Sequence, residues 1–332
     1  SGMTDQSPVD RLLQGQTTDN DLFELRLNAM NMMFHWRKSP VRGLLGGKIE
    51  LIPHQLFVAH EVSRRQLPRV LLADEVGLGK TIEACLILNQ MIVCGRVNRV
   101  FILLPNSLVN QWFIELLRRF NLWFSIFDEE RCCAIETCQP GFNPFEDDQL
   151  LIADIDWLSK STKRMEQVVQ APWDMLIVDE AHHLEWNPEK PSAKYQLTQA
   201  LGQRAGSLLL LSATPQQLGL ESHFARLHLL DPTRFSNFAA FKDETDQYKP
   251  VANLCKKLID NESLNIEELQ HFPCPESLLS KATLELAKSN KLTTQTRDKL
   301  IRDLADRHGT GRVLFRNTRK TIHGFPKRLA KL

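Results

Sequence analysis

The chain reads LLADEVGLGKT from residue 71 to residue 81, an apolar strand that runs into a loop with two glycines. Apolar residues at helical spacing follow from Ile82 to Met91, so the loop opens a helix. Gly77 and Gly79 have no Cβ, which lets the backbone adopt positive φ and approach bound oxygen atoms closely. Backbone N–H groups at the start of such a helix point at anions. The order of strand, loop and helix predicts a phosphate-binding loop.

Two side chains at the end of this loop suit a nucleoside triphosphate and its metal ion. Lys80 supplies a positive charge for the β- and γ-phosphates, and the Thr81 hydroxyl suits Mg²⁺. Asp74 stands where the full phosphate-loop pattern has a glycine, so a glycine turn beside a surface lysine is the alternative. The strand before the loop and the helix after it favour the nucleotide site. The expected nucleotide-binding residues of the loop are Asp74, Glu75, Val76, Gly77, Leu78, Gly79, Lys80 and Thr81.

A second apolar strand, Met175–Val178, ends in the acidic pair Asp179 and Glu180. A strand this apolar is buried on both faces, as in a parallel sheet. Ligands of open parallel sheets bind at the carboxyl ends of the strands, where this pair and the glycine loop would both lie. We expect Asp179 to hold Mg²⁺ and Glu180 to orient and deprotonate water. The alternative for an acidic pair after a strand is a helix N-cap.

The rest of the chain alternates between strands and helices, which predicts an α/β protein with a parallel sheet and helices on both faces. The expected strands are 70–73, 99–104, 123–127, 150–153, 175–178 and 208–211. The expected helices between and around them are 51–65, 82–94, 107–119, 155–169, 193–203 and 221–229. Residues 9–38 predict a helical lead-in packed on the domain that follows, and residues 243–308 a helical excursion without strands.

Three further polar residues fall near the expected site. Gln55 precedes the glycine loop on a helix, where its planar amide could read an adenine edge or could simply be solvated. Ser212 and Thr214 follow the strand 208–211 and would lie at the same sheet edge as the acidic pair. They could hydrogen-bond the end of the acidic strand and respond to the state of the bound phosphates, or they could cap a turn.

Composition sets wider limits on the protein. The 332 residues are 42% hydrophobic and 24% charged, an ordinary globular composition, and the net charge of +1 indicates no particular partner. The seven cysteines include no C-x-x-C pair, which favours reduced thiols in a cytoplasmic protein. No apolar run approaches about 18 residues, so no membrane span is expected. Ser1 and Gly2 before Met3 resemble the remnant of a cleaved tag.

The motifs at residues 74–81, 179–182 and 212–214 resemble, in this order, the first three ATPase motifs of superfamily-two helicases. The run Asp-Glu-x-Gly-Leu-Gly-Lys-Thr narrows the resemblance to the Swi/Snf branch. Within that branch, the chain is similar to the RNA-polymerase-associated ATPases of bacteria. The segments that carry this closer likeness are 51–55, 179–184, 221–227 and 313–319.

The resemblance implies a bacterial, cytoplasmic ATP- and Mg²⁺-dependent enzyme that acts on nucleic acid. It makes Gln55 the adenine-reading residue, and it assigns Lys80 and Glu180 to catalysis and Thr81 and Asp179 to the metal. The residues implied to couple the site to movement are His182, Ser212 and Thr214. Those implied to contact nucleic acid are Asn106, Ser107 and Gln111. The family's next nucleic-acid motif offers a small hydroxyl residue, but Asp154 stands there, and an acid repels phosphate.

The resemblance also implies partners and a division of the chain. The partners are core RNA polymerase, double-stranded DNA or a DNA/RNA hybrid, and a second RecA-like lobe that supplies arginine fingers. The expected segments are a tag remnant with helical lead-in (1–45), a RecA-like ATP-binding lobe (46–242), a helical excursion (243–310) and a basic connection to the second lobe (311–332). Arginine fingers contribute roughly 10³–10⁵ in rate in related enzymes, so we expect this lobe alone to be nearly inactive.

Two other readings of the sequence compete with this one. The motor lobe of a restriction or defence translocase would share the ATPase motifs but not the matches at 221–227 and 313–319. A non-enzymatic module that docks on polymerase or nucleic acid would carry a vestigial nucleotide site. The intact Lys80, Thr81 and acidic pair disfavour this last possibility.

Overall fold

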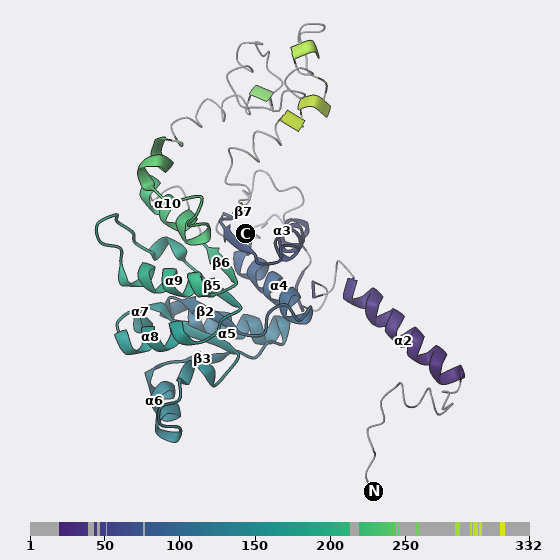
Figure 1. Cartoon of the computed structure of the whole chain (residues 1–332), viewed down its shortest axis with the longest axis horizontal. Helices are drawn as coiled ribbons and strands as arrows, with labels where there is room; N and C mark the ends of the chain where they lie inside the picture. The colour runs from purple at the N-terminus through teal and green to yellow at the C-terminus, as the bar shows by residue number, and fades with distance from the viewer. Residues whose placement is uncertain are drawn as a thin grey trace, which may run out of the picture.

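The computed structural model describes residues 20–38, 43–44, 47–50, 52–75, 77–212, 219–243 and 313–315, with a few short pieces between 245 and 300. Seven parallel strands form one sheet in the order β3-β4-β2-β5-β6-β1-β7 (Figure 1). The strands are β1 (Arg69–Leu72), β2 (Val100–Leu104), β3 (Ser125–Phe127), β4 (Leu150–Asp154), β5 (Met175–Val178), β6 (Ser207–Leu211) and β7 (Leu314–Phe315).

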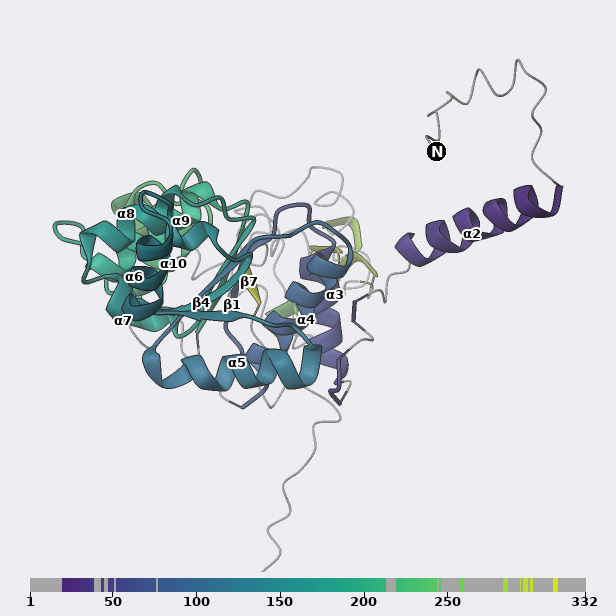
Figure 2. The ribbon, with the colours of Figure 1, turned by 90° about the horizontal axis from the view of Figure 1, so that it is seen from below.

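Helices cover both faces of this sheet (Figure 2). One face carries α3 (Pro53–Ser63), α4 (Lys80–Val93) and α5 (Asn106–Phe120). The other face carries α7 (Ile155–Leu158), α8 (Thr162–Gln170), α9 (Ala193–Arg204) and α10 (Gly219–Leu230), and α6 (Glu129–Cys138) adds to it near β3. The predicted fold class is therefore confirmed.

Side chains of successive strand residues enter the two cores alternately, because the side chains of a strand point to opposite faces. In β1, Val70 and Leu72 join the core under α4, whereas Leu71 joins the core under α9 and α10. All three are fully buried. Burial on both faces explains why the strand sequences are continuous apolar runs without polar alternation.

Two differences from the predicted helices have local causes. The single helix expected over residues 155–169 is wrong, because Ser161 interrupts it as the N-cap of α8 and accepts a hydrogen bond from the Arg164 N–H. Helix α6 has too weak an apolar periodicity to be predicted. It begins at the N-cap Asp128, whose carboxylate accepts from the Arg131 N–H.

The expected connection at residues 311–332 contains a strand, β7, that pairs with β1. The Leu71 N–H donates to the Val313 carbonyl at 2.6 Å, and the Ala73 N–H donates to the Phe315 carbonyl at 2.7 Å. The strand that leads into the glycine loop is therefore held between β6 and a segment from far along the chain. The rest of 311–332 and most of the expected helical excursion lie outside the described residues.

Helix α2 (Asn20–Lys38) projects away from the sheet in both views. Its large apolar side chains are exposed, with Leu25 65% and Met32 74% accessible. The predicted packing of this lead-in on the following domain is wrong for α2, because its apolar residues lie on several sides and form no single stripe. No helix in the described part of the chain has the length and apolar character needed to cross a membrane.

Candidate active site

The glycine loop joins β1 to α4 at the carboxyl end of the sheet. Gly77 and Gly79 have φ angles of 86° and 91°, in the region that glycine adopts without strain. Gly79 is the N-cap residue of α4, and no side chain caps this helix. The first-turn N–H groups of α4 can therefore bind an anion. Val76 lies outside the described residues.

Gln55 of α3 packs directly against this loop. Its side-chain amide donates to the Leu78 carbonyl at 2.8 Å, and the His54 ring nitrogen lies 3.3 Å from the same oxygen. A Cβ at position 79 would lie only 2.3 Å from the Gln55 Nε2, so this contact requires Gly79. Gln55 is 3% exposed, which rules out the solvated alternative. Adenine recognition by Gln55 stays a prediction, and the structure adds that the residue supports the loop.

Asp74 turns its side chain into the protein, which explains how an acid fits where the loop pattern has glycine. Asp74 and Glu83 of α4 are both fully buried. Burial, followed by the neighbouring Asp74 carboxyl group, raises the pKa of Glu83 to about 10, while the Lys80 ammonium opposes the shift. Glu83 therefore keeps a proton at neutral pH and hydrogen-bonds Asp74. His54 Nε2 lies 3.8 Å from Glu83 Oε1.

Lys80 folds back on the loop that it ends. Its ammonium group donates to the Asp74 backbone carbonyl at 2.8 Å. A bound phosphate is a stronger partner for this cation than a neutral carbonyl is. Lys80 and Thr81 open α4 side by side and are both partly accessible, whereas Glu75 is exposed on the outside of the loop.

Asp179 and Glu180 follow β5, and β6 separates this strand from β1 in the sheet. Asp179 Oδ2 accepts a hydrogen bond from the Trp112 indole N–H at 2.9 Å, and its Oδ1 accepts from the Glu180 N–H at 2.7 Å. Burial raises the pKa of Asp179, and the hydrogen bond from Trp112 opposes that shift. A buried carboxylate with fixed orientation is a suitable hard-oxygen ligand for Mg²⁺.

Glu180 has a positive φ of 49°, a conformation that only one other non-glycine residue, Asn121, adopts in the described part of the chain. Such a conformation costs on the order of 1–3 kcal/mol and is concentrated at functional sites. The Glu180 Oε2 lies 2.9 Å from the His182 Nδ1. Burial lowers the pKa of His182, so its ring is neutral at pH 7. Glu180 makes no side-chain cap to the short helix that follows, which disfavours the N-cap alternative.

Ser212 lies between the loop and the acidic pair, because β6 is the strand between β1 and β5. Its N–H donates to the Leu72 carbonyl at 3.0 Å. Its hydroxyl is buried without a hydrogen-bond partner among the described residues. An unsatisfied hydroxyl at this position is consistent with the predicted coupling role, and Thr214 lies outside the described residues.

The residues predicted to contact nucleic acid lie at the same edge of the sheet. Asn106, Ser107 and Gln111 are exposed on the first turns of α5, which begins at the carboxyl end of β2, the neighbour of β5. Asp154, the acid that replaces a hydroxyl residue, caps α7 by accepting from the Asp156 N–H at 2.8 Å. The Asp154 carboxylate thus has a structural role as the N-cap of α7.

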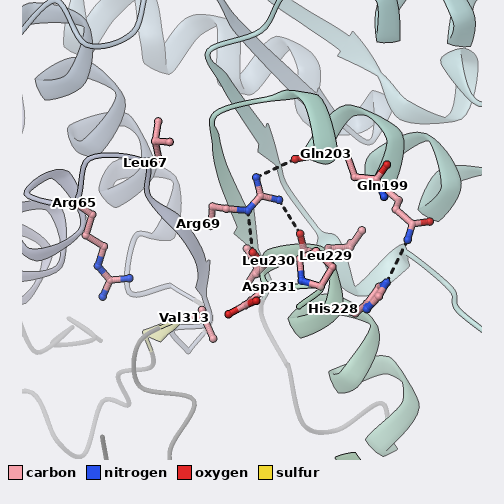
Figure 3. A pocket seen from close by; sticks show the side chains of 12 residues that line it. Arg65, Leu67, Arg69, Gln199, Gln203, His228, Leu229, Leu230, Asp231 and Val313 are labelled. Carbon is pink, nitrogen blue, oxygen red and sulfur yellow. Dashed lines mark hydrogen bonds between the residues drawn. The ribbon is translucent and has the colours of Figure 1, made fainter. Parts of the chain in front are cut away.

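A cavity lies at each end of the sheet, and the two cavities differ in size. At the carboxyl end, a cavity of about 150 Å³ is lined by Pro105, Asp179 and Glu180 among others. At the amino end of β1, a cavity of about 490 Å³ lies between the ends of α9 and α10 (Figure 3). Arg69 lines this cavity and donates to four backbone carbonyls, those of Gly202, Ala205, Leu229 and Leu230. The larger cavity therefore lies away from every predicted site residue.

His54, Glu83 and Trp112 contact predicted site residues, although the sequence alone gave none of them a role at the nucleotide. His54 and Glu83 contact the residues of the glycine loop, and Trp112 contacts the acidic pair. A sequence signal existed only for Trp112, which adjoins Gln111. An acid in the first turn of α4 instead suggests a favourable interaction with the helix dipole.

The parallel sheet with helices on both faces is that of a RecA-like lobe. Residues 54–309 match the SNF2-related domain, and the chain therefore belongs to this family.

The sequences of known proteins support this family assignment. The chain is 51% identical over 327 residues to the RNA polymerase-associated protein RapA of Vibrio campbellii, which covers 97% of this chain and 33% of the relative. It is 52% identical over 327 residues, with the same coverage, to RapA of Vibrio cholerae strain M66-2. The chain thus spans about a third of the length of the curated relatives it matches.

Among solved structures, the SWI2/SNF2 ATPase core of Sulfolobus solfataricus in complex with dsDNA has a similar fold. The TM-score is 0.51 at 16% sequence identity, and the match covers 82% of this chain and 45% of that chain. At this identity the likeness supports the fold of the lobe.

Proposed function

We propose that this chain is the ATP-binding lobe of a nucleic-acid-dependent ATPase. The observation that carries the proposal is the convergence of the glycine loop after β1 and the acidic pair after β5 on one edge of the sheet, with Ser212 between them. Membership of the SNF2-related family supports ATP as the nucleotide and Mg²⁺ as its metal ion.

The chain's own residues fit that ligand. The N–H groups of the loop and of the first turn of α4 would bind the phosphates, and Lys80 would leave the Asp74 carbonyl to pair with them. Thr81 and Asp179 offer the hard oxygen donors that Mg²⁺ prefers. The metal ion would neutralise negative charge on the phosphates.

Glu180 is the residue that would act on water. Its carboxylate can orient a water molecule and accept a proton from it. The neutral His182 ring beside it can hydrogen-bond the carboxylate and fix its direction. The strained backbone at Glu180 holds this carboxylate at the sheet edge rather than along the following helix.

The proposal extends to partners of the whole protein. Relatives that are named for association with RNA polymerase support core polymerase as a partner. The Sulfolobus core is named for a complex with dsDNA, which supports duplex nucleic acid on the face with Asn106, Ser107 and Gln111. A second RecA-like lobe that follows a basic connection (311–332) would supply the arginine finger. The lobe itself would span residues 46–242, with a helical lead-in before it and an excursion after it.

Nucleotide binding by this chain tests the proposal. We expect ATP to bind with an affinity that Mg²⁺ increases, and Lys80→Ala to reduce that affinity at least tenfold without lowering the melting temperature by more than a few degrees. Lys163→Ala is the matched control, because Lys163 is an exposed lysine in an ion pair with Glu136, away from the loop. Nucleotide binding that survives Lys80→Ala would contradict the assignment.

The proposed partner needs a separate experiment. Core RNA polymerase should co-purify with the full-length protein, with or without the Lys80→Ala change. A protein that binds polymerase but shows no Mg²⁺-dependent nucleotide binding would instead be the docking module. A protein that hydrolyses ATP in the presence of DNA but does not bind RNA polymerase would match the restriction or defence translocase alternative.

A further inference from the structure

Helix α5 presents two faces with different partners. Its exposed face carries Asn106, Ser107 and Gln111, the residues proposed to contact nucleic acid. Its buried face carries an apolar stripe of Val109, Trp112, Leu116 and Phe120. Trp112 directly follows Gln111, so the two faces meet at adjacent residues of one rigid helix.

Trp112 is the only member of this stripe with a polar atom, and that atom is used. The side chain is 1% exposed, and its indole N–H donates to Asp179 Oδ2 at 2.9 Å. A buried indole needs such a partner. Here the partner is the carboxylate proposed to hold Mg²⁺ rather than a backbone carbonyl.

We propose that Trp112 is a positioning residue that fixes the Asp179 carboxylate for Mg²⁺ and thereby connects α5 to the nucleotide site. The inference rests on the proposed function, because it concerns the metal ligand of that site. Among the described residues, two hydrogen bonds set the orientation of the carboxylate: the indole N–H on Oδ2 and the Glu180 N–H on Oδ1. The second comes from the adjacent residue, so among the described residues Trp112 is the hydrogen-bond donor that relates the Asp179 carboxylate to another element.

Loss of the indole N–H would leave Asp179 Oδ2 buried without its donor. The carboxylate could then rotate about its side-chain torsions, and Mg²⁺ would have to fix it again on binding. Groups that orient metal ligands typically contribute 10–100-fold to metal affinity or activity. A shift of α5 caused by nucleic acid on its exposed face would move the indole, and Asp179 with it.

Trp112→Phe tests the proposal, because phenylalanine keeps an aromatic ring but lacks the N–H. Binding of a fluorescent ATP analogue is measured across a Mg²⁺ titration, and we expect half-maximal binding to require 10–100-fold more Mg²⁺. Binding of the same analogue without Mg²⁺ should change less than twofold, which a general loss of structure would not allow. An unchanged Mg²⁺ requirement would overturn the proposal.

Trp173→Phe is the matched control. Trp173 is 4% exposed and donates its indole N–H to the Val168 carbonyl at 2.8 Å, but it precedes β5 and lies at the opposite end of that strand from Asp179. It should lower stability as much as Trp112→Phe does and leave the Mg²⁺ requirement within twofold. An equal Mg²⁺ shift in both variants would show that buried tryptophans affect binding only through stability.

If the Trp112 variant does not fold, a measurement on the unchanged protein tests the same proposal. In protein labelled with ¹⁵N-tryptophan and saturated with ADP, the Trp112 indole resonance is assigned by substitution of the other five tryptophans one at a time. Addition of Mg²⁺ should shift this resonance and leave that of Trp173 in place. If Mg²⁺ and ADP bind but the Trp112 resonance stays, this inference fails and the proposed function stands; absence of any Mg²⁺–ADP binding contradicts the proposed function itself.

Discussion

The two ends of the parallel sheet differ in the environment of one polar side chain each, Arg69 and Ser212. At the amino end, the Arg69 guanidinium spans the ends of α9 and α10 and donates to four carbonyls between 2.8 and 3.2 Å. At the carboxyl end, Glu180 has a strained backbone and Ser212 a buried hydroxyl without a partner among the described residues. Among the described residues, the Arg69 guanidinium is thus satisfied within the fold, whereas the Ser212 hydroxyl is not.

The larger cavity is not at the end of the sheet where the site is proposed. The cavity of about 490 Å³ adjoins Arg69, whose hydrogen bonds hold two helix ends together. The cavity of about 150 Å³ adjoins the acidic pair. A ligand gains most where polar groups have unmet hydrogen-bonding capacity, since it then supplies partners that the fold lacks.

The largest effect is expected for Glu180→Gln, measured as ATP turnover by the full-length protein. Glutamine can position water but cannot take its proton, so turnover should fall roughly 10²–10⁴-fold. Mg²⁺–ATP binding and the free energy of unfolding should stay nearly unchanged, because the amide has the same shape. Glu185→Gln, at an exposed acid nearby, serves as the control. Equal loss of binding and turnover in Glu180→Gln would mean that the residue holds the nucleotide.

At the amino end, Arg69→Met should show the reverse pattern. It removes charged hydrogen bonds to the ends of α9 and α10, so the free energy of unfolding should fall by about 2–4 kcal/mol. Chemical denaturation measures the loss, and the nucleotide affinity of the remaining folded protein should be unchanged. Arg65→Met, at another residue of the same cavity, controls for the lost side chain. A weakened nucleotide affinity would show that the two ends are coupled.

A smaller change in stability is expected for Glu83→Gln. The pKa of Glu83 is raised from 4.5 to about 10, so the folded protein carries one proton here that the unfolded chain lacks between these values. The stabilising contribution is fully present below pH 4.5 and is lost as pH rises toward 10, by at most about 1.4 kcal/mol per pH unit. Glutamine should remove this dependence and stabilise the protein above neutral pH by about 1–3 kcal/mol. If the unfolding free energies of the unchanged protein and of Glu83→Gln depended on pH in the same way, the raised pKa of Glu83 would be refuted.

The last prediction concerns a paired cluster away from either end. Arg164 is 2% exposed and bonds Glu129 and Glu136, and these hydrogen bonds lower the pKa of both acids to about 2. Their contribution is present above pH 4.5 and is lost as pH falls toward 2. Arg164→Met should therefore flatten the fall in stability over this acid range, whereas Arg131→Met, at an exposed pair with Asp148, should not.

Sequence patterns predicted the sheet and the approach of the glycine loop to the acidic pair, because continuous apolar runs mark buried parallel strands. They did not predict β7, since two residues before an arginine give no periodic signal. They also missed the contacts of Glu83 and Trp112. Each depends on a residue distant in sequence, Asp74 for one and Asp179 for the other, and each looks ordinary on its own helix.

The pairing of β1 with β7 has a consequence for the newly made chain. During synthesis, Leu72 leaves the ribosome more than 200 residues before Phe315, its partner in the sheet. At about 5–20 residues per second, this edge of β1 stays without its neighbour for roughly 10–50 s. Unpaired strand edges recruit other strands and promote aggregation. Slow translation between β6 and β7 would lengthen that exposure, so the nascent lobe should need chaperone protection most during this interval.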